Sequence, residues 1–83
     1  MPLFMDVHRT LPDGATADDL VGAHTADLKT QEKYGVQYLN FWADPEGGKA
    51  FCLVEAPDAE TARRVHQEAH GLVADEIYPV FQG

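Results

Sequence analysis

Two histidines four residues apart are the feature of the sequence best suited to chemistry. His66 and His70 stand in the segment VHQEAHG, where a helix is expected, so the two imidazoles lie about one turn apart on one helix face. Two imidazoles at this spacing can ligate one first-row divalent metal ion if further ligands complete the site. The alternative is a pair of partly exposed histidines near a helix end, where they suit the helix dipole. Gln67 directly follows the first histidine, so the segment is not the H-E-x-x-H motif of a zinc protease.

Three further side chains are candidate ligands. Asp6 and His8 alternate on a predicted strand, which places a carboxylate and an imidazole on one side of that strand. This strand is expected to end at the same edge of the domain as the helix with the two histidines, although a polar lining of a dimer cleft explains the pair equally well. His24 falls in the apolar stripe of an earlier predicted helix, where a lone histidine is more often half-buried and hydrogen-bonded than a ligand. The candidate metal ligands are therefore His66, His70, His8, Asp6 and His24.

The elements that must position these residues are expected in the order β-α-β-β-α-β. Thr16, with Asp19 three residues later, forms a capping box that begins the first helix, and Gly35 ends that helix. Asp58 caps the second helix, which ends at Gly71. By number, the predicted strands cover 3–9, 36–43, 49–56 and 76–81, and the predicted helices cover 16–35 and 58–71.

This order predicts an α+β fold of the ferredoxin-like type, with one antiparallel sheet and two helices on one of its faces. Residues 1–83 are expected to form a single domain. The third strand is apolar on both sides and is expected beside the first strand in the centre of the sheet. Pro79 places the last strand at an edge.

Alternation along the strands and helices predicts which residues each surface carries. Cys52 is expected to face the helices as a small core residue. The helices are expected to bury Leu20, Val21, His24 and Leu28 from the first, and Ala62, Val65 and Ala69 from the second. The open face of the sheet is expected to carry Phe4, Asp6, His8, Tyr38, Asn40, Trp42, Phe51, Leu53 and Glu55. So many apolar and aromatic side chains on an uncovered face predict a homodimer that packs face to face.

The charge balance of the chain restricts its partners. The net charge is −8, from 14 acidic and 6 basic residues, and the basic residues form no patch of the kind that nucleic acid or an anionic membrane needs. A negative surface concentrates cations, which weakly favours metal binding. The single cysteine cannot form an internal disulfide, no signal-peptide pattern is present, and no apolar run approaches the roughly 20 residues of a membrane span. A cytoplasmic protein without nucleic-acid or membrane partners is therefore predicted.

The segments MPLFMDVH, KYGVQYLNFW, FCLVEAPDAE and VHQEAHGLVADEIY together resemble a family of small bacterial proteins, formerly of unknown function and described as nickel-binding. The resemblance covers nearly the whole chain. It implies a ferredoxin-like dimer that binds nickel(II), with a role in nickel sequestration or tolerance, and it makes the histidines candidate ligands. The residues that match the family pattern are Asp6, His8, Cys52, His66 and His70.

Three functional hypotheses follow. The first is a metal-binding protein rather than an enzyme, and imidazole ligands alone do not separate nickel from other divalent first-row ions. The second is a small cofactor-free enzyme of the dimeric α+β barrel type, which needs a pocket of several hundred cubic ångströms on the sheet face. Its acid–base groups would be Asp6, His8 and Glu55, and Tyr38 and Trp42 would form the pocket wall. The third is a structural or regulatory dimer whose histidines are incidental.

Overall fold

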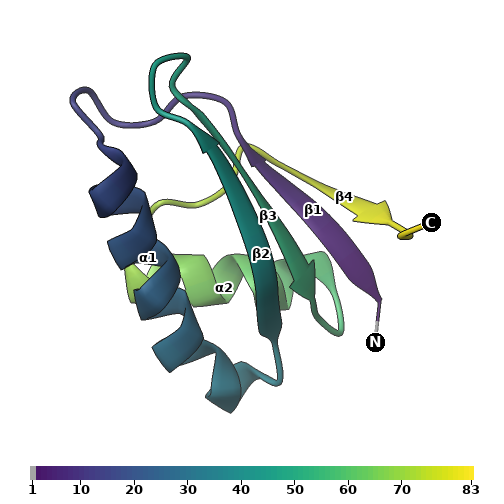
Figure 1. The fold of residues 1–83 in the computed structure, drawn as a ribbon. Helices are drawn as coiled ribbons and strands as arrows, with labels where there is room; N and C mark the ends of the chain where they lie inside the picture. The colour runs from purple at the N-terminus through teal and green to yellow at the C-terminus, as the bar shows by residue number, and fades with distance from the viewer. Residues whose placement is uncertain (1) are drawn as a thin grey trace.

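The structure of the chain is a computed structural model that describes residues 2–83. One four-stranded antiparallel sheet has the strand order β2-β3-β1-β4, and two helices lie on one of its faces (Figure 1). This arrangement confirms the predicted α+β, ferredoxin-like fold. The strands are β1 (Leu3–His8), β2 (Gln37–Asp44), β3 (Lys49–Glu55) and β4 (Glu76–Val80), and the helices are α1 (Ala17–Thr30), the 3-10 helix η1 (Gln31–Tyr34) and α2 (Ala59–Ala69).

The helix ends follow the local sequence signals. Thr16 and Asp19 form the predicted capping box, in which the Thr16 hydroxyl accepts from the Asp19 amide at 3.2 Å and the Asp19 carboxylate accepts from the Thr16 amide at 3.0 Å. Asp58 caps α2 by accepting the amide of Thr61 at 2.7 Å. Gly35 follows η1 with a φ of 65°, a left-handed conformation that glycine adopts without strain. Within residues 2–83, no helix is long and apolar enough to cross a membrane.

The two faces of β1 are the reverse of the prediction. Phe4, Asp6 and His8 face the helices and are at most 9% exposed, whereas the alternate residues Leu3, Met5 and Val7 are only half-buried. Alternation gives the period of a strand but not which face lies inward. Both sets of side chains on β1 include apolar residues, so the strand itself does not decide its orientation. The polar pair lies inward because α2 and β2 supply partners for it, as described below.

A β-bulge in β2 accounts for a second difference. Tyr38 is opposite Val54 and Asn40 is opposite Leu53, so two steps along β2 match one step along β3. Tyr38 therefore faces the helices and is 2% exposed, and the prediction that it lies on the open face is wrong. The predictions for the other open-face residues of β2 and β3 are confirmed by the register: Asn40, Trp42, Phe51, Leu53 and Glu55.

The buried side chains of the two helices agree with the prediction to different extents. In α2, Ala62 and Val65 are fully buried as predicted, His66 is 1% exposed, and Ala69 is only half-buried. In α1, Leu20 is buried as predicted, but the prediction for Val21 and Leu28 is wrong, since they are 52% and 44% exposed. The buried face of α1 instead runs from Leu20 past His24 to Asp27, which is 2% exposed. Cys52 faces the helices, as predicted, and is 8% exposed.

Candidate metal centre

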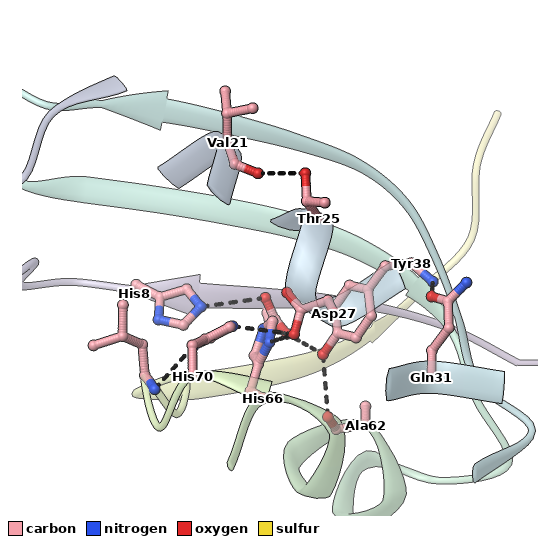
Figure 2. A network of polar contacts seen from close by, with 11 residues as sticks. His8, Val21, Thr25, Asp27, Gln31, Tyr38, Ala62, His66 and His70 are labelled. Carbon is pink, nitrogen blue, oxygen red and sulfur yellow. Dashed lines mark hydrogen bonds and ion pairs between the residues drawn. The ribbon is translucent and has the colours of Figure 1, made fainter. Parts of the chain in front are cut away.

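Polar side chains from both helices and the central strands meet in the layer between the sheet and the helices. Figure 2 shows His8, His66 and His70 gathered beside Asp27. The fold brings them together because β1 ends where α2 ends, as the topology predicts. The side chains form two overlapping groups, which share His66. The helix set is Asp27, His66 and His70, and the sheet set is Asp6, His8, Cys52 and His66.

The helix set is arranged around one carboxylate oxygen. His66 Nδ1 lies 2.8 Å from Asp27 Oδ1 in a hydrogen bond, and His70 Nε2 lies 3.0 Å from the same oxygen. The centroids of the two imidazole rings are 4.9 Å apart, as expected for residues four apart on a helix. The amide of Leu72 donates to His70 Nδ1 at 3.0 Å, which leaves the proton of a neutral His70 ring on Nε2. The predicted pairing of His66 and His70 on one helix face is therefore present, and Asp27 lies between them.

The sheet set lies on the other side of His66. His66 Nε2 is 3.0 Å from Asp6 Oδ2, and His8 Nε2 is 3.8 Å from Asp6 Oδ1. Cys52 is the direct cross-strand neighbour of Asp6. The ligand atoms of all four side chains lie within 4.8 Å of one another, and all four residues are buried.

Tyr38 holds the sheet set in place. Its hydroxyl lies 3.1 Å from both Asp6 Oδ2 and the carbonyl oxygen of Ala62, and its one proton is shared between these acceptors. Its ring stacks on the His66 imidazole with centroids 4.6 Å apart. Burial, together with the nearby Asp6 carboxylate, raises the pKa of Tyr38 above its ordinary value, so the hydroxyl remains a donor at neutral pH.

The protonation of the site follows from burial and from the two carboxylates. Burial opposes a charged His66, but the contacts with Asp27 and Asp6 outweigh burial and raise the pKa of His66 to about 11. Burial acts to raise the pKa of Asp27, but the hydrogen bond from His66 and the nearby His70 ring hold it below its ordinary value. Burial lowers the pKa of His8, against the effect of Asp6, so this ring is neutral and has a free lone pair at neutral pH. Burial raises the pKa of the Cys52 thiol to about 11.

Several ligand atoms of the two sets lack a hydrogen-bond partner within the described chain. Asp6 Oδ1, His66 Nε2 and His70 Nε2 are buried and unpartnered, as is Nδ1 of His24, which lies outside both sets. His66 Nε2 and His70 Nε2 each lie 3.0 Å from a carboxylate oxygen, but the direction of approach does not suit an N–H···O bond. Buried polar atoms are normally hydrogen-bonded. Imidazole nitrogens and a carboxylate oxygen that converge without partners are the donor set that a first-row divalent ion requires, so the residues fit a metal.

A small pocket adjoins the two sets. It has a volume of about 30 Å³, and His8, His24, Asp27, His66 and His70 are among the residues that line it. This space holds an ion or about one water molecule, and it is far below the roughly 300 Å³ of a typical small-molecule site.

The fold brings four of the five predicted ligands together. His66, His70, His8 and Asp6 meet in the two sets, although Asp6 and His8 do so on the helix side of the sheet rather than on its open face. His24 belongs to neither set. Its ring packs against Phe41, with centroids 4.8 Å apart, and it lines the pocket.

The acid–base group considered for an enzyme is not assembled. Glu55 pairs with Leu3 on the open face, where Trp42 also lies, whereas Asp6, His8 and Tyr38 lie on the helix side. These predicted partners are therefore on opposite faces of the sheet.

Sequence reasoning missed Asp27 and the polar role of Tyr38. The position of Asp27 carried a signal, because Leu20, His24 and Asp27 follow the i, i+4, i+7 spacing of one helix face. A carboxylate at a core-facing position is rarely buried without a partner. Tyr38 carried no such signal, because the bulge that turns it inward is not evident from alternation.

Comparisons with known proteins identify the family of the chain. The family described as "Nickel responsive protein SCO4226-like" matches residues 4–80. No curated protein matches the sequence. The crystal structure of SCO4226 from Streptomyces coelicolor A3(2) superposes with a TM-score of 0.88 at 46% sequence identity, over 98% of each chain. The resemblance drawn from the sequence is thereby confirmed, and the chain belongs to the family of nickel responsive SCO4226-like proteins.

Proposed function

We propose that this protein binds a divalent first-row metal ion, nickel(II), at the cluster around His66. The observation that carries the proposal is that buried ligand atoms of Asp6, His8 and His66 lie within 4.8 Å of one another, with Asp6 Oδ1 and His66 Nε2 unpartnered. The description of the family as nickel responsive supports nickel among the ions that such ligands accept. Binding of this kind lowers the concentration of free nickel, and we propose sequestration or tolerance as its purpose.

The hydrogen bonds favour His66 Nε2 as the central ligand atom. Asp27 accepts from His66 Nδ1, which fixes the other nitrogen as the one that points toward Asp6. A carboxylate behind a ligating histidine is the usual support of a metal-bound imidazole. His8 and Asp6 are the natural further ligands, and Asp27 orients the ring. His70 can join the ion only if its proton moves to Nδ1, which costs the hydrogen bond from Leu72.

The pocket volume favours an ion over an organic substrate. The space beside His8 is about 30 Å³, whereas the enzyme hypothesis requires a pocket of several hundred cubic ångströms.

The first test is calorimetric titration of tag-free protein with nickel. We expect micromolar or tighter binding that weakens as the pH falls, because protons compete for the imidazole and carboxylate ligands. Asp6→Asn keeps the shape of the side chain but removes its charge, and it is expected to weaken nickel binding by roughly tenfold or more. Asp13→Asn is the matched control, since it makes the same change at an exposed position. Millimolar binding by the natural sequence, or equal affinity in the two variants, would contradict the proposal.

We also propose that the open face of the sheet is covered by a second copy of the chain. Trp42 and Tyr78 on this face are 51% and 48% exposed, next to Phe51 and Met5. Exposed aromatic side chains that gather on one sheet face are typical of an interface. The absence of nucleic-acid partners and a cytoplasmic location stay predictions from composition.

Trp42→Glu is expected to convert a dimer into monomers, because it places a charge in an apolar contact. Sedimentation equilibrium measures the change. Val21→Glu is the matched control, since Val21 is 52% exposed on α1, away from the sheet. A natural sequence that sediments as a monomer, or a dimer that survives Trp42→Glu, would exclude this interface.

A further inference from the structure

Cys52 lies where a ligand of the metal centre is expected. It is the cross-strand partner of Asp6, so the two side chains project from neighbouring strands on the same face of the sheet. Its sulfur belongs to the group of ligand atoms that lie within 4.8 Å of one another, with those of Asp6, His8 and His66. Two of these partners, Asp6 and His66, are at most 1% exposed and carry unpartnered atoms in the same cluster.

We propose that Cys52 binds the metal ion through its sulfur, so that a thiolate completes a set with one carboxylate and two imidazoles. The inference rests on the proposed metal-binding function and specifies the chemical class of its ligands. Asp6, His8, Cys52 and His66 supply four protein ligands, the number that a closed tetrahedral site needs. The thiol proton of Cys52 and the Nε2 proton of the charged His66 both leave to solvent when these atoms bind the ion.

Charge balance supports a thiolate in this place. All four residues are at most 8% exposed, and a divalent ion there is costly unless its charge is neutralised. The Asp6 carboxylate supplies one negative charge and the Cys52 thiolate supplies the second, while the two imidazoles are neutral ligands. The four ligands and a divalent ion then sum to zero net charge. Without the thiolate, the second negative charge would have to come from Asp27, which lies behind His66 and outside the sheet set.

A sulfur ligand restricts the ions that the centre accepts. Thiolate is a soft ligand that favours nickel, zinc, cobalt(II) and copper over magnesium, calcium and manganese, which prefer oxygen. With a thiolate ligand, the site therefore prefers first-row ions that bind sulfur. Magnesium and calcium in large excess are expected to compete poorly for it.

Cobalt(II) is the probe that tests the inference. The chain contains one cysteine, so any thiolate-to-cobalt charge-transfer band in the near ultraviolet arises from Cys52. We expect this band to appear in tag-free protein and to saturate at a fixed ratio of cobalt to protein. Cys52→Ser is expected to remove the band and to weaken nickel binding by roughly tenfold or more. Asp13→Asn is expected to retain both the charge-transfer band and the nickel affinity. Urea-unfolded protein is a second control, which shows how much of the band comes from cobalt bound to the thiol of an unfolded chain.

The outcomes separate this inference from the proposed function. Cobalt that binds tightly without a thiolate band would overturn the role of Cys52. The metal centre would then consist of imidazole and carboxylate ligands alone. A band that persists in Cys52→Ser would also overturn it. Protein that binds neither cobalt nor nickel at micromolar concentration would overturn the metal centre and this inference together. Thermal unfolding of metal-free Cys52→Ser and of Cys52→Ala, a second small substitution, shows whether a loss of binding arises from misfolding.

Discussion

His66→Gln is expected to abolish tight nickel binding, with a loss of affinity of roughly 100-fold or more. His66 is the one residue that both sets share, through Nδ1 toward Asp27 and through Nε2 toward Asp6. Loss of an outer partner of a metal ligand costs about 10- to 100-fold in affinity, so the loss of a central ligand exceeds that range. Calorimetry with nickel measures the effect, and the cobalt spectrum of the same variant is expected to lose its charge-transfer band.

Glutamine is chosen because its amide can still donate to Asp27 and fills much of the space of the imidazole. Thermal unfolding of the metal-free variant checks that the chain remains folded. His24→Gln makes the same substitution in the lining of the same pocket, at a residue that belongs to neither set. We expect a much smaller loss of nickel affinity in that variant. Comparable losses at His24 and His66 would show that the ion sits in the pocket rather than between the two sets.

The metal-free protein is expected to become less stable as the pH rises from about 6.5 toward 11. The folded state raises the pKa of His66 to about 11, whereas an imidazole in the unfolded chain titrates near 6.5. The stability that comes from charged His66 is therefore complete below about pH 6.5 and is lost as the pH approaches the folded value. The contribution of Asp27 to stability has the opposite pH dependence. Its pKa in the folded state lies below the ordinary value, so its contribution is lost in acid. The two effects predict maximum stability at mildly acidic pH.

Urea unfolding in the presence of a chelator, at a series of pH values from about 4 to 10, measures this dependence. Asp27→Asn removes the carboxylate that hydrogen-bonds His66 Nδ1, so the fall in stability on the alkaline side is expected to become shallower. Asp13→Asn is expected to retain the steep fall, since it removes an exposed charge outside the site. Stability that stays level between about pH 6.5 and 10 would contradict a charged His66 held between two carboxylates.

The sequence alone was sufficient for the order of elements and for the spacing of the main ligands. These features depend on local rules: alternation of side chains along a strand, the capping box at Thr16, the glycine at the end of η1, and the four-residue interval between His66 and His70. Topology also predicted that His8 would lie near His66, and the ring centroids are 5.2 Å apart. The family was evident from motifs that run through nearly the whole chain, and the match over residues 4–80 confirms it.

The tertiary structure alone decided which way the polar groups face. Asp6 lies inward because Tyr38 and His66 from other elements are present to pair with it. His8 lies inward beside Asp6 and His66. An isolated strand gives no information on this choice, because the cost of burying a carboxylate depends on partners that are remote in sequence. Tyr38 reaches Asp6 only because a bulge shifts the register of β2 against β3, and Asp27 is buried only because α1 packs against α2. The ligands were evident from residue type and spacing, whereas the neighbours that orient and neutralise them arise from long-range contacts that local sequence patterns do not encode.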